Sequence, residues 1–461
     1  MSRIFQPLQL EQLSLVTFGN YIYKIGHDIL GQPDADLQIY EYCKKVHGIL
    51  ESGVPPRLAD RITSYLITRV EELSSIQQKG HKLKLVKQAL LGAIIHPAST
   101  KLNLSTCIPS WLPTLKLLTE LRVDSMFLKF NENVFIFALY SMNLLQVFCY
   151  SWFCTNKILD TLAKWCFHLR VLEISGSKKV TNKSVSSILQ LKKLEQLELF
   201  NTRIHGKGIT KILQGLNTTI LTSFSCNNIN KCQFKLMTNN MPKIKTLKFQ
   251  TKKCDIVTLK DFTEVKNLGL FRVDMKRSDF NVVDIRPDSF RHLKVLSLTK
   301  MKFSSVFTLL YEVGSRISEL TLHEVKYISA IAIAETCPVL RVLKIVDCYE
   351  DGCAKMLWKS CNGASRSLFQ SVEEVVIHLE DDIYFIIFVL SCCTNVKKVD
   401  VGLFGDDTEE DFNCPDILES ILMVNRLSQL EEFHTMQFLK EEVIKRTVEQ
   451  CPKLSLITGK L

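Results

Sequence analysis

Two copies of one short pattern decide the fold: Leu169-Arg-Val-Leu172-Glu-Ile174 and Leu194-Glu-Gln-Leu197-Glu-Leu199. Each copy reads L-x-x-L-x-L, and the second begins 25 residues after the first. In a strand, the last two apolar residues of each copy point to one face, and the glutamate between them points to the other. One such strand cannot bury its apolar face alone. Stacked copies can, so the pattern predicts a repeat array with a continuous core.

Further copies lie on both sides of these two, mostly at steps of about 21 to 27 residues. This period is typical of the leucine-rich repeat. The stretches between copies have helical spacing, so each repeat contributes a strand and a helix, and we expect an α/β leucine-rich-repeat solenoid (horseshoe). The first strand is expected at 101–105 and a weak last copy starts at Leu454. The strand cores between them are predicted at 118–123, 144–149, 169–174, 194–199, 221–226, 244–249, 265–270, 293–298, 317–322, 340–345, 372–377, 396–401 and from Leu430 to Phe433.

The first part of the chain has helical spacing and no repeat. Apolar residues recur at steps of three and four, which predicts helices over 14–30 and 37–50, a third that begins at Pro55-Pro56, and a fourth over 81–95. Prolines suit a first helical turn because its amide hydrogens have no partner within the helix. We therefore predict two domains: a small all-α N-terminal module at 1–97 and the solenoid at 98–461.

Composition narrows the classes of partner and compartment. The formal net charge is +10 over 461 residues, and no dense Lys/Arg block occurs, so no nucleic-acid partner is expected. The most apolar stretch, 383–390, is too short to span a membrane and is expected to be a buried helix. Residues 1–10 show no signal-peptide pattern. The expected localisation is cytoplasmic, with the nucleus as a possible additional compartment.

No motif for catalysis or cofactor binding is present. The sequence has no Gly-rich phosphate loop, no H-E-x-x-H and no G-x-S-x-G, so we expect a protein that is not an enzyme and takes no cofactor. The chain has 16 cysteines, many of them inside or just before repeat strands. These are expected to be small buried hydrophobic residues. Their spacing matches no common zinc site.

Repeats with Cys-Pro ahead of the strand, at Cys337-Pro338 and Cys451-Pro452, resemble those of leucine-rich-repeat substrate receptors of cullin-RING ubiquitin ligases. In the N-terminal module, Ser14-Leu15-x-x-x-Gly19-x-x-x-Tyr23 resembles an Elongin-binding box, with Gly19 and Tyr23 departing from that motif's Cys and aliphatic residue. The segment from Val54 to Ile62 resembles a cullin-2 box.

Together the two segments resemble a VHL-box of the zyg-eleven-like type, which implies Elongin B/C and cullin-2 as partners. Helix-in-groove docking is the physical basis of such binding. The implied adaptor-binding residues are Ser14, Leu15, Phe18 and Ile22, and the implied cullin-binding residues are Val54, Pro55, Leu58 and Ile62.

Two alternatives explain the same residues. The segment from Val54 to Leu66 also resembles the start of an F-box, which implies a Skp-type adaptor and cullin-1, although 73–91 lacks the Cys and Trp that usually follow. Alternatively, 14–95 only caps the open end of the solenoid. Exposure of the Leu15, Phe18 and Ile22 stripe and of the segment from Val54 to Ile62 favours docking, and their burial against the first repeat favours a cap.

The resemblance implies that the protein binds a target protein through the concave face of the solenoid and delivers it to the ligase. The alternative function is a protein-interaction scaffold with no role in ubiquitin transfer. Exposed aromatic side chains beside charges are typical of binding hot spots, although each aromatic residue could instead pack into the repeats. The candidate substrate-binding residues on this face are Arg122, Tyr150, Phe200, Lys248, Phe271, His323, Lys344 and His378.

Overall fold

The structure is a computed structural model that describes residues 7–31, 35–73, 81–104, 115–123, 132–216, 220–227, 229–241, 243–251, 264–272, 290–350, 368–379, 383–403, 417–423 and 425–460. The chain divides into two compact units, 1–221 and 222–461, and each is described by itself.

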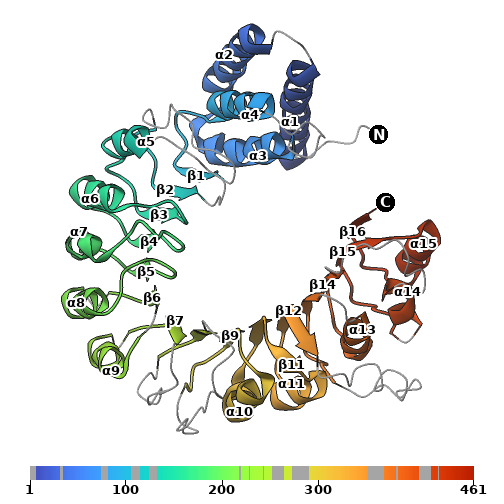
Figure 1. Ribbon diagram of the computed structural model, residues 1–461. Coiled ribbons are helices and arrows are strands. Elements are labelled where there is room, and N and C mark those ends of the chain that lie inside the picture. The colour runs from blue at the N-terminus through green and yellow to red at the C-terminus, as the bar shows by residue number, and fades with distance from the viewer. Residues whose placement is uncertain are drawn as a thin grey trace. The chain divides into compact units, whose positions relative to one another are not determined.

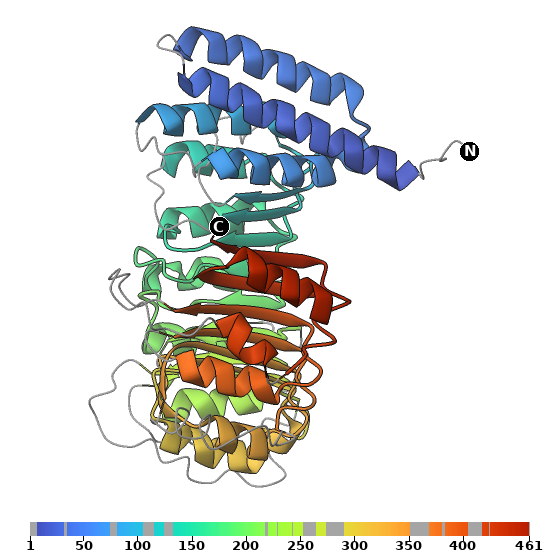
Figure 2. The same ribbon diagram turned by 90° about the vertical axis from the view of Figure 1, so that its right-hand side faces the viewer.

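The first unit begins with four helices, as the apolar spacing predicts. They are α1 (Pro7–Gly31), α2 (Ala35–Gly53), α3 (Ala59–Glu72) and α4 (His81–Ile94), and the short 3-10 helix η1 (Pro56–Leu58) leads into α3. The helices pack on one another (Figure 2). Their shared core contains Ile22, Leu50 and Leu66, whose side chains are fully buried.

Five parallel strands follow in the same unit, paired in chain order. They are β1 (Lys101–Leu104), β2 (Glu120–Val123), β3 (Val147–Tyr150), β4 (Val171–Glu173) and β5 (Gln196–Glu198). The segments between strands form α5 (Glu132–Leu139), α6 (Asn156–Trp165), the 3-10 helix η4 (Asn182–Ser184), α7 (Val185–Gln190) and α8 (Lys207–Gly215). These helices lie along one side of the strands (Figure 1).

The second unit continues the same plan. Its parallel strands are β6 (Ser223–Cys226), β7 (Thr246–Thr251), β8 (Asn267–Arg272), β9 (Val295–Thr299), β10 (Glu319–His323), β12 (Val342–Glu350), β13 (Glu374–Leu379), β14 (Lys398–Leu403), β15 (Glu432–Phe438) and β16 (Leu456–Lys460), and β11 (Lys326–Ile328) pairs with β12. Its helices are α9 (Lys231–Asn240), α10 (Phe303–Val313), the 3-10 helix η6 (Gly314–Arg316), α11 (Ala330–Thr336), α13 (Ile383–Cys392), α14 (Ile417–Leu422) and α15 (Glu441–Gln450).

The strand register places the leucines of the repeat in continuous rows. In the first unit, Phe148 lies opposite Leu172, and Leu172 lies opposite Leu197. In the second unit, Leu320 lies opposite Leu343, which in turn lies opposite Val375. All of these side chains are at most 1% exposed. The chain is therefore the predicted α/β leucine-rich-repeat solenoid with helices ahead of its first strand, and the predicted buried helix at 383–390 is confirmed as α13.

One predicted strand core is wrong by one residue. The sequence pattern suggested Leu144, Val147 and Cys149 as the core positions of β3, but Leu121 lies opposite Phe148 and Val123 lies opposite Tyr150. The core row therefore uses Leu145, Phe148 and Tyr150. Since side chains alternate along a strand, a shift of one residue exchanges the buried face for the exposed one.

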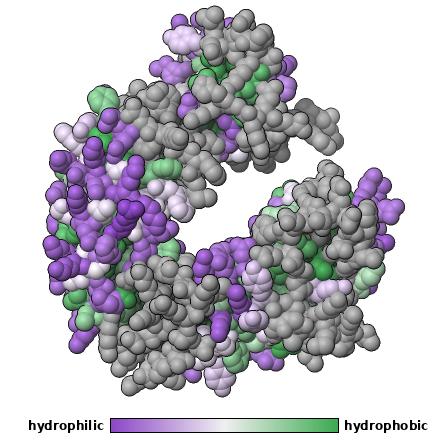
Figure 3. Space-filling view, viewed as in Figure 1, coloured by the Kyte–Doolittle hydropathy of each residue, from purple (hydrophilic) through white to green (hydrophobic). Residues whose placement is uncertain are grey.

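The outer surface of the first unit is strongly hydrophilic over α6 to α8 (Figure 3). Residues 132–216 carry 11 Lys and Arg against 5 Asp and Glu, a net charge of +6. Among the described helices, none combines the length and the hydropathy that a membrane crossing requires.

Candidate functional site

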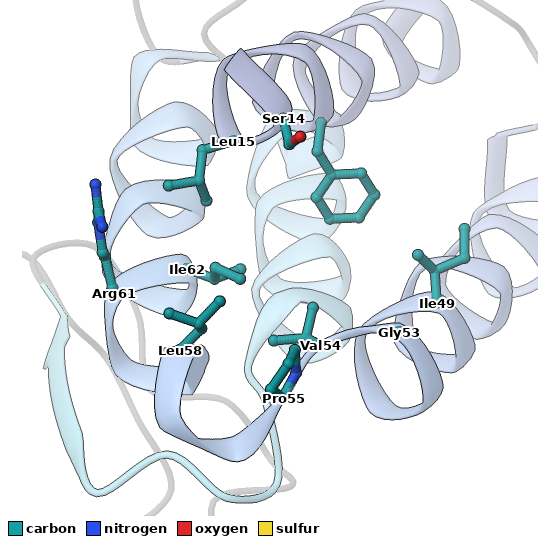
Figure 4. A pocket seen from close by; sticks show the side chains of 10 residues that line it. Ser14, Leu15, Ile49, Gly53, Val54, Pro55, Leu58, Arg61 and Ile62 are labelled. Atoms are coloured by element: carbon teal, nitrogen blue, oxygen red, sulfur yellow. The ribbon is translucent and has the colours of Figure 1, made fainter. Parts of the chain in front are cut away.

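An apolar groove of about 400 Å³ opens in the N-terminal helices, where α1 passes the end of α2 and the start of α3 (Figure 4). Every one of the eight residues that the box resemblances single out belongs to this region, and seven of them line the groove directly. The full lining is Ser14, Leu15, Phe18, Ile49, Gly53, Val54, Pro55, Leu58, Arg61 and Ile62. The eighth residue, Ile22, is one turn of α1 further along and fully buried.

Helix α1 supplies one wall of the groove because its apolar residues share one stripe. Leu15 and Phe18 are half-buried and reach the groove, whereas Ile22 enters the core between the helices. The stripe is therefore neither fully exposed nor fully packed. Its first half is accessible to a partner, and its second half anchors α1 to the protein.

The opposite wall comes from the turn between α2 and α3. The Val54 amide donates to the Leu50 carbonyl oxygen at 3.1 Å, and the Leu58 amide donates to the Pro55 carbonyl oxygen at 2.9 Å, which closes the chain into η1. Leu58 is half-buried and Ile62 is 9% exposed, and Figure 4 shows both on the groove side of α3, below Leu15 in this view. The isoleucine Ile49, 48% exposed at the end of α2, widens the apolar surface. Ile49 lies outside both box patterns. Only the apolar spacing of α2 could have identified it from the sequence.

The two positions that depart from the Elongin-binding box pack against α3. A Cβ atom on Gly19 would lie 2.5 Å from Cε1 of Tyr65, so the close approach of α1 to α3 excludes a cysteine there without a shift of that ring. Tyr23 has the guanidinium of Arg69 5.1 Å from its ring centroid, and Arg69 also donates to Asn20 at 2.9 Å. Packing within the protein thus explains both departures.

The other side of α3 holds the first strand of the repeats. The Asp60 carboxylate accepts hydrogen bonds from the amides of Thr100 and Lys101, at 2.6 and 3.0 Å, and from the Thr100 hydroxyl at 2.6 Å. Thr63 and Ser99 share a buried hydrogen bond of 3.0 Å. Helix α3 therefore caps β1 with one face while its other face lines the groove.

The candidate substrate-binding residues are divided between the two units, and each set is described by itself. In the first unit, Arg122 is half-buried and donates to Glu120 at 2.6 Å, with Glu173 of β4 3.6 Å away. Phe200 is half-buried just after β5. The prediction that Tyr150 is exposed is wrong: it is fully buried, against Phe135 and Phe148, because of the register of β3.

In the second unit, three of the candidates are held in pairs with carboxylates. Lys344 contacts Glu374 at 2.9 Å, His323 contacts Asp347 at 3.1 Å, and His378 contacts Asp400 at 3.0 Å. Lys248 is half-buried. The Phe271 backbone lies in β8, and its side chain is outside the described residues.

Of these carboxylates, Glu374 lines a charged hollow of about 240 Å³ at the starts of β10, β12, β13 and β14. Arg341 and Lys397 both bond Glu373, at 2.6 and 2.9 Å, and these bonds hold the pKa of Glu373 below its usual value, with Lys397 the larger cause. The sequence did not indicate this hollow, because the charged residues that line it lie in adjacent repeats. Only the strand register brings them together. Among the described residues, no group of three or more His, Cys, Asp or Glu side chains is arranged to hold a metal ion.

The sequence matches no protein-family model and no curated protein. Similar solved structures include the complex of Rad7 and Elc1 in yeast, at 14% identity over 97% of both chains with a TM-score of 0.41. An internalin (InlF) from Listeria monocytogenes matches at 13% identity over 84% of this chain and 86% of its own, with a TM-score of 0.29. The functional domain of InlJ from the same organism matches at 13% identity over 79% and 67%, with a TM-score of 0.27. Such low identities and TM-scores assign no function.

Proposed function

We propose that the protein is a substrate-recognition adaptor of a cullin-type ubiquitin ligase, cytoplasmic and without catalysis of its own. One observation carries this proposal. Two segments about 40 residues apart, chosen because they resemble an Elongin-binding box and a cullin-2 box, line the same open apolar groove. A cap alone would need no accessible groove between α1 and α3.

The groove suits a partner that presents an apolar side chain. Its walls are apolar, and Leu15, Phe18 and Leu58 each bury part of their surface already, so little side-chain entropy is lost when a partner covers the rest. An apolar side chain inserted by the adaptor gains roughly 1.5–3 kcal/mol when fully buried. The leucine-rich repeats then hold the target protein on their solvent face, and the ligase core performs the chemistry.

The test is direct binding between purified proteins. The full chain is titrated with Elongin B/C and then with cullin-2, beside the variants Leu15→Asp and Leu58→Asp. Val16→Asp is the matched control, because Val16 is 42% exposed on the same helix and does not line the groove. We expect both groove variants to lose binding while Val16→Asp retains it, with unchanged thermal melts.

A specific observation also favours the second function, a protein-interaction scaffold whose helices only cap the repeats. The hydrogen bonds of Asp60 to Thr100 and Lys101 are what a cap requires. If neither Elongin B/C nor a Skp-type adaptor binds the folded protein, the scaffold stands and the ligase proposal is wrong. Binding of a Skp-type adaptor that is lost with Leu58→Asp alone would instead identify an F-box and cullin-1.

A further inference from the structure

Three aromatic rings of the first unit contact one another at the surface, at the C-terminal ends of α5 and α6. Phe137 and Tyr140 have ring centroids 6.4 Å apart, and Tyr140 and Trp165 have centroids 5.5 Å apart, both edge to face. The three residues are 64%, 47% and 45% exposed, respectively. Contiguous exposed aromatic surface of this kind typically marks a binding site.

The turns that precede β2, β3 and β4 extend the same surface. Thr119, Gln146 and Arg170 occupy equivalent positions in successive repeats. The Gln146 amide donates to the Thr119 carbonyl oxygen, and the Arg170 amide donates to the Gln146 carbonyl oxygen, both at 2.8 Å. Two or three residues before them come Leu117, Leu144 and Phe167, which are 49%, 42% and 64% exposed. Neighbouring strands lie about 4.8 Å apart, so these side chains are neighbours. We name the edge patch as the set Leu117, Phe137, Tyr140, Leu144, Trp165 and Phe167.

The surface becomes basic beside the edge patch. His168 and Lys193 continue the row of Leu117 and Leu144, with Nζ of Lys193 3.0 Å from Nδ1 of His168. Lys164 and Lys192 are also exposed, and among the described residues no carboxylate pairs with Lys164, Lys192 or Lys193. By contrast, cations on the solvent face of the sheets, such as Arg122 and Lys344, are held in ion pairs.

We propose that the edge patch binds an acidic segment of a partner protein that also carries apolar side chains. The aromatic residues supply the buried centre of the interface, and the lysines that have no carboxylate partner in the described part of the chain attract the acidic end. A second copy of this chain fits poorly, because it would bring two basic surfaces together. Nucleic acid fits poorly as well, since the centre of the surface is aliphatic and aromatic rather than basic.

The experiment selects peptides from a random 12-residue display library on the immobilised full chain, and measures the best peptide by fluorescence anisotropy. We expect peptides that combine Phe, Trp or Leu with several Asp or Glu. The double variant Trp165→Ala/Phe167→Glu should weaken binding more than about tenfold. The double variant Lys192→Glu/Lys193→Glu should weaken binding about tenfold, and its affinity should depend less on salt concentration than that of the wild type.

Matched controls keep the outcomes distinct. Tyr311→Glu changes an aromatic residue of the second unit that is 74% exposed, and Lys207→Glu/Lys211→Glu changes two exposed lysines elsewhere on the first unit; both should bind within about twofold of wild type. Leu15→Asp should also bind normally, so this proposal fails or stands independently of the proposed adaptor function. Three results overturn it: no enriched peptide, peptides without acidic residues, or light scattering that shows a dimer which Phe167→Glu dissolves.

Discussion

Leu144 and Leu145 are adjacent in sequence and differ fully in burial, at 42% and 0% exposed. Leu145→Ala should lower the free energy of unfolding by about 2–5 kcal/mol, because it opens a cavity in the core. Leu144→Ala should change it by no more than about 0.5 kcal/mol. Urea unfolding of the two variants checks the register of β3. Equal effects, or a larger effect at Leu144, would mean that the strand is shifted by one residue.

Individual cysteines of the native protein should differ in their reactivity toward alkylating reagents. Burial raises the pKa of the Cys337 thiol to about 11 and of the Cys166 thiol to about 12, whereas Cys232 on α9 is exposed. The thiolate is the reactive form, and it is scarce at pH 8 when the pKa is raised. Iodoacetamide at pH 8 should therefore label Cys232 in the native protein, and Cys166 and Cys337 only after denaturation, as read by peptide mass spectrometry. Early labelling of Cys166 in the native protein would contradict its burial.

At the scale of elements, α3 joins the N-terminal helices to the repeats. Asp60→Ala removes the acceptor for the amides of Thr100 and Lys101, so it should cost about 1–3 kcal/mol of unfolding free energy. Ser64→Ala, at an exposed position of the same helix, is the matched control and should be near neutral. Thermal melts measure both, and an unchanged melt for Asp60→Ala would mean that α3 does not hold β1.

At the scale of the whole molecule, each repeat contacts mainly its neighbours, so damage should stay local. Leu197→Ala in β5 should raise amide hydrogen exchange in β4, β5 and α7 and leave α13 and β14 unchanged. Gln196→Ala changes the neighbouring, exposed residue and should leave amide hydrogen exchange unchanged in all of these elements. Mass-spectrometric hydrogen exchange distinguishes this from uniform loosening, which would indicate a single cooperative core.

The sequence predicted the fold well because the repeat period and the helical spacing are strong local signals. It failed at β3, where Leu144-Leu145 and Val147-Phe148 are apolar pairs that fit either register equally. The groove residues were named from the sequence, but their convergence depends on how α1 crosses α3. The pairing of His323 with Asp347 was missed because the two belong to successive repeats 24 residues apart.

Because α3 both lines the groove and bonds β1, formation of the groove depends on folding of the first repeat. Ile62 faces the groove while Asp60, two residues away, bonds the start of β1. A chain whose first repeat has not closed would lack the support that fixes this helix, and so would present no complete groove. A partner that docks in the groove would therefore bind only those molecules whose first repeat has folded.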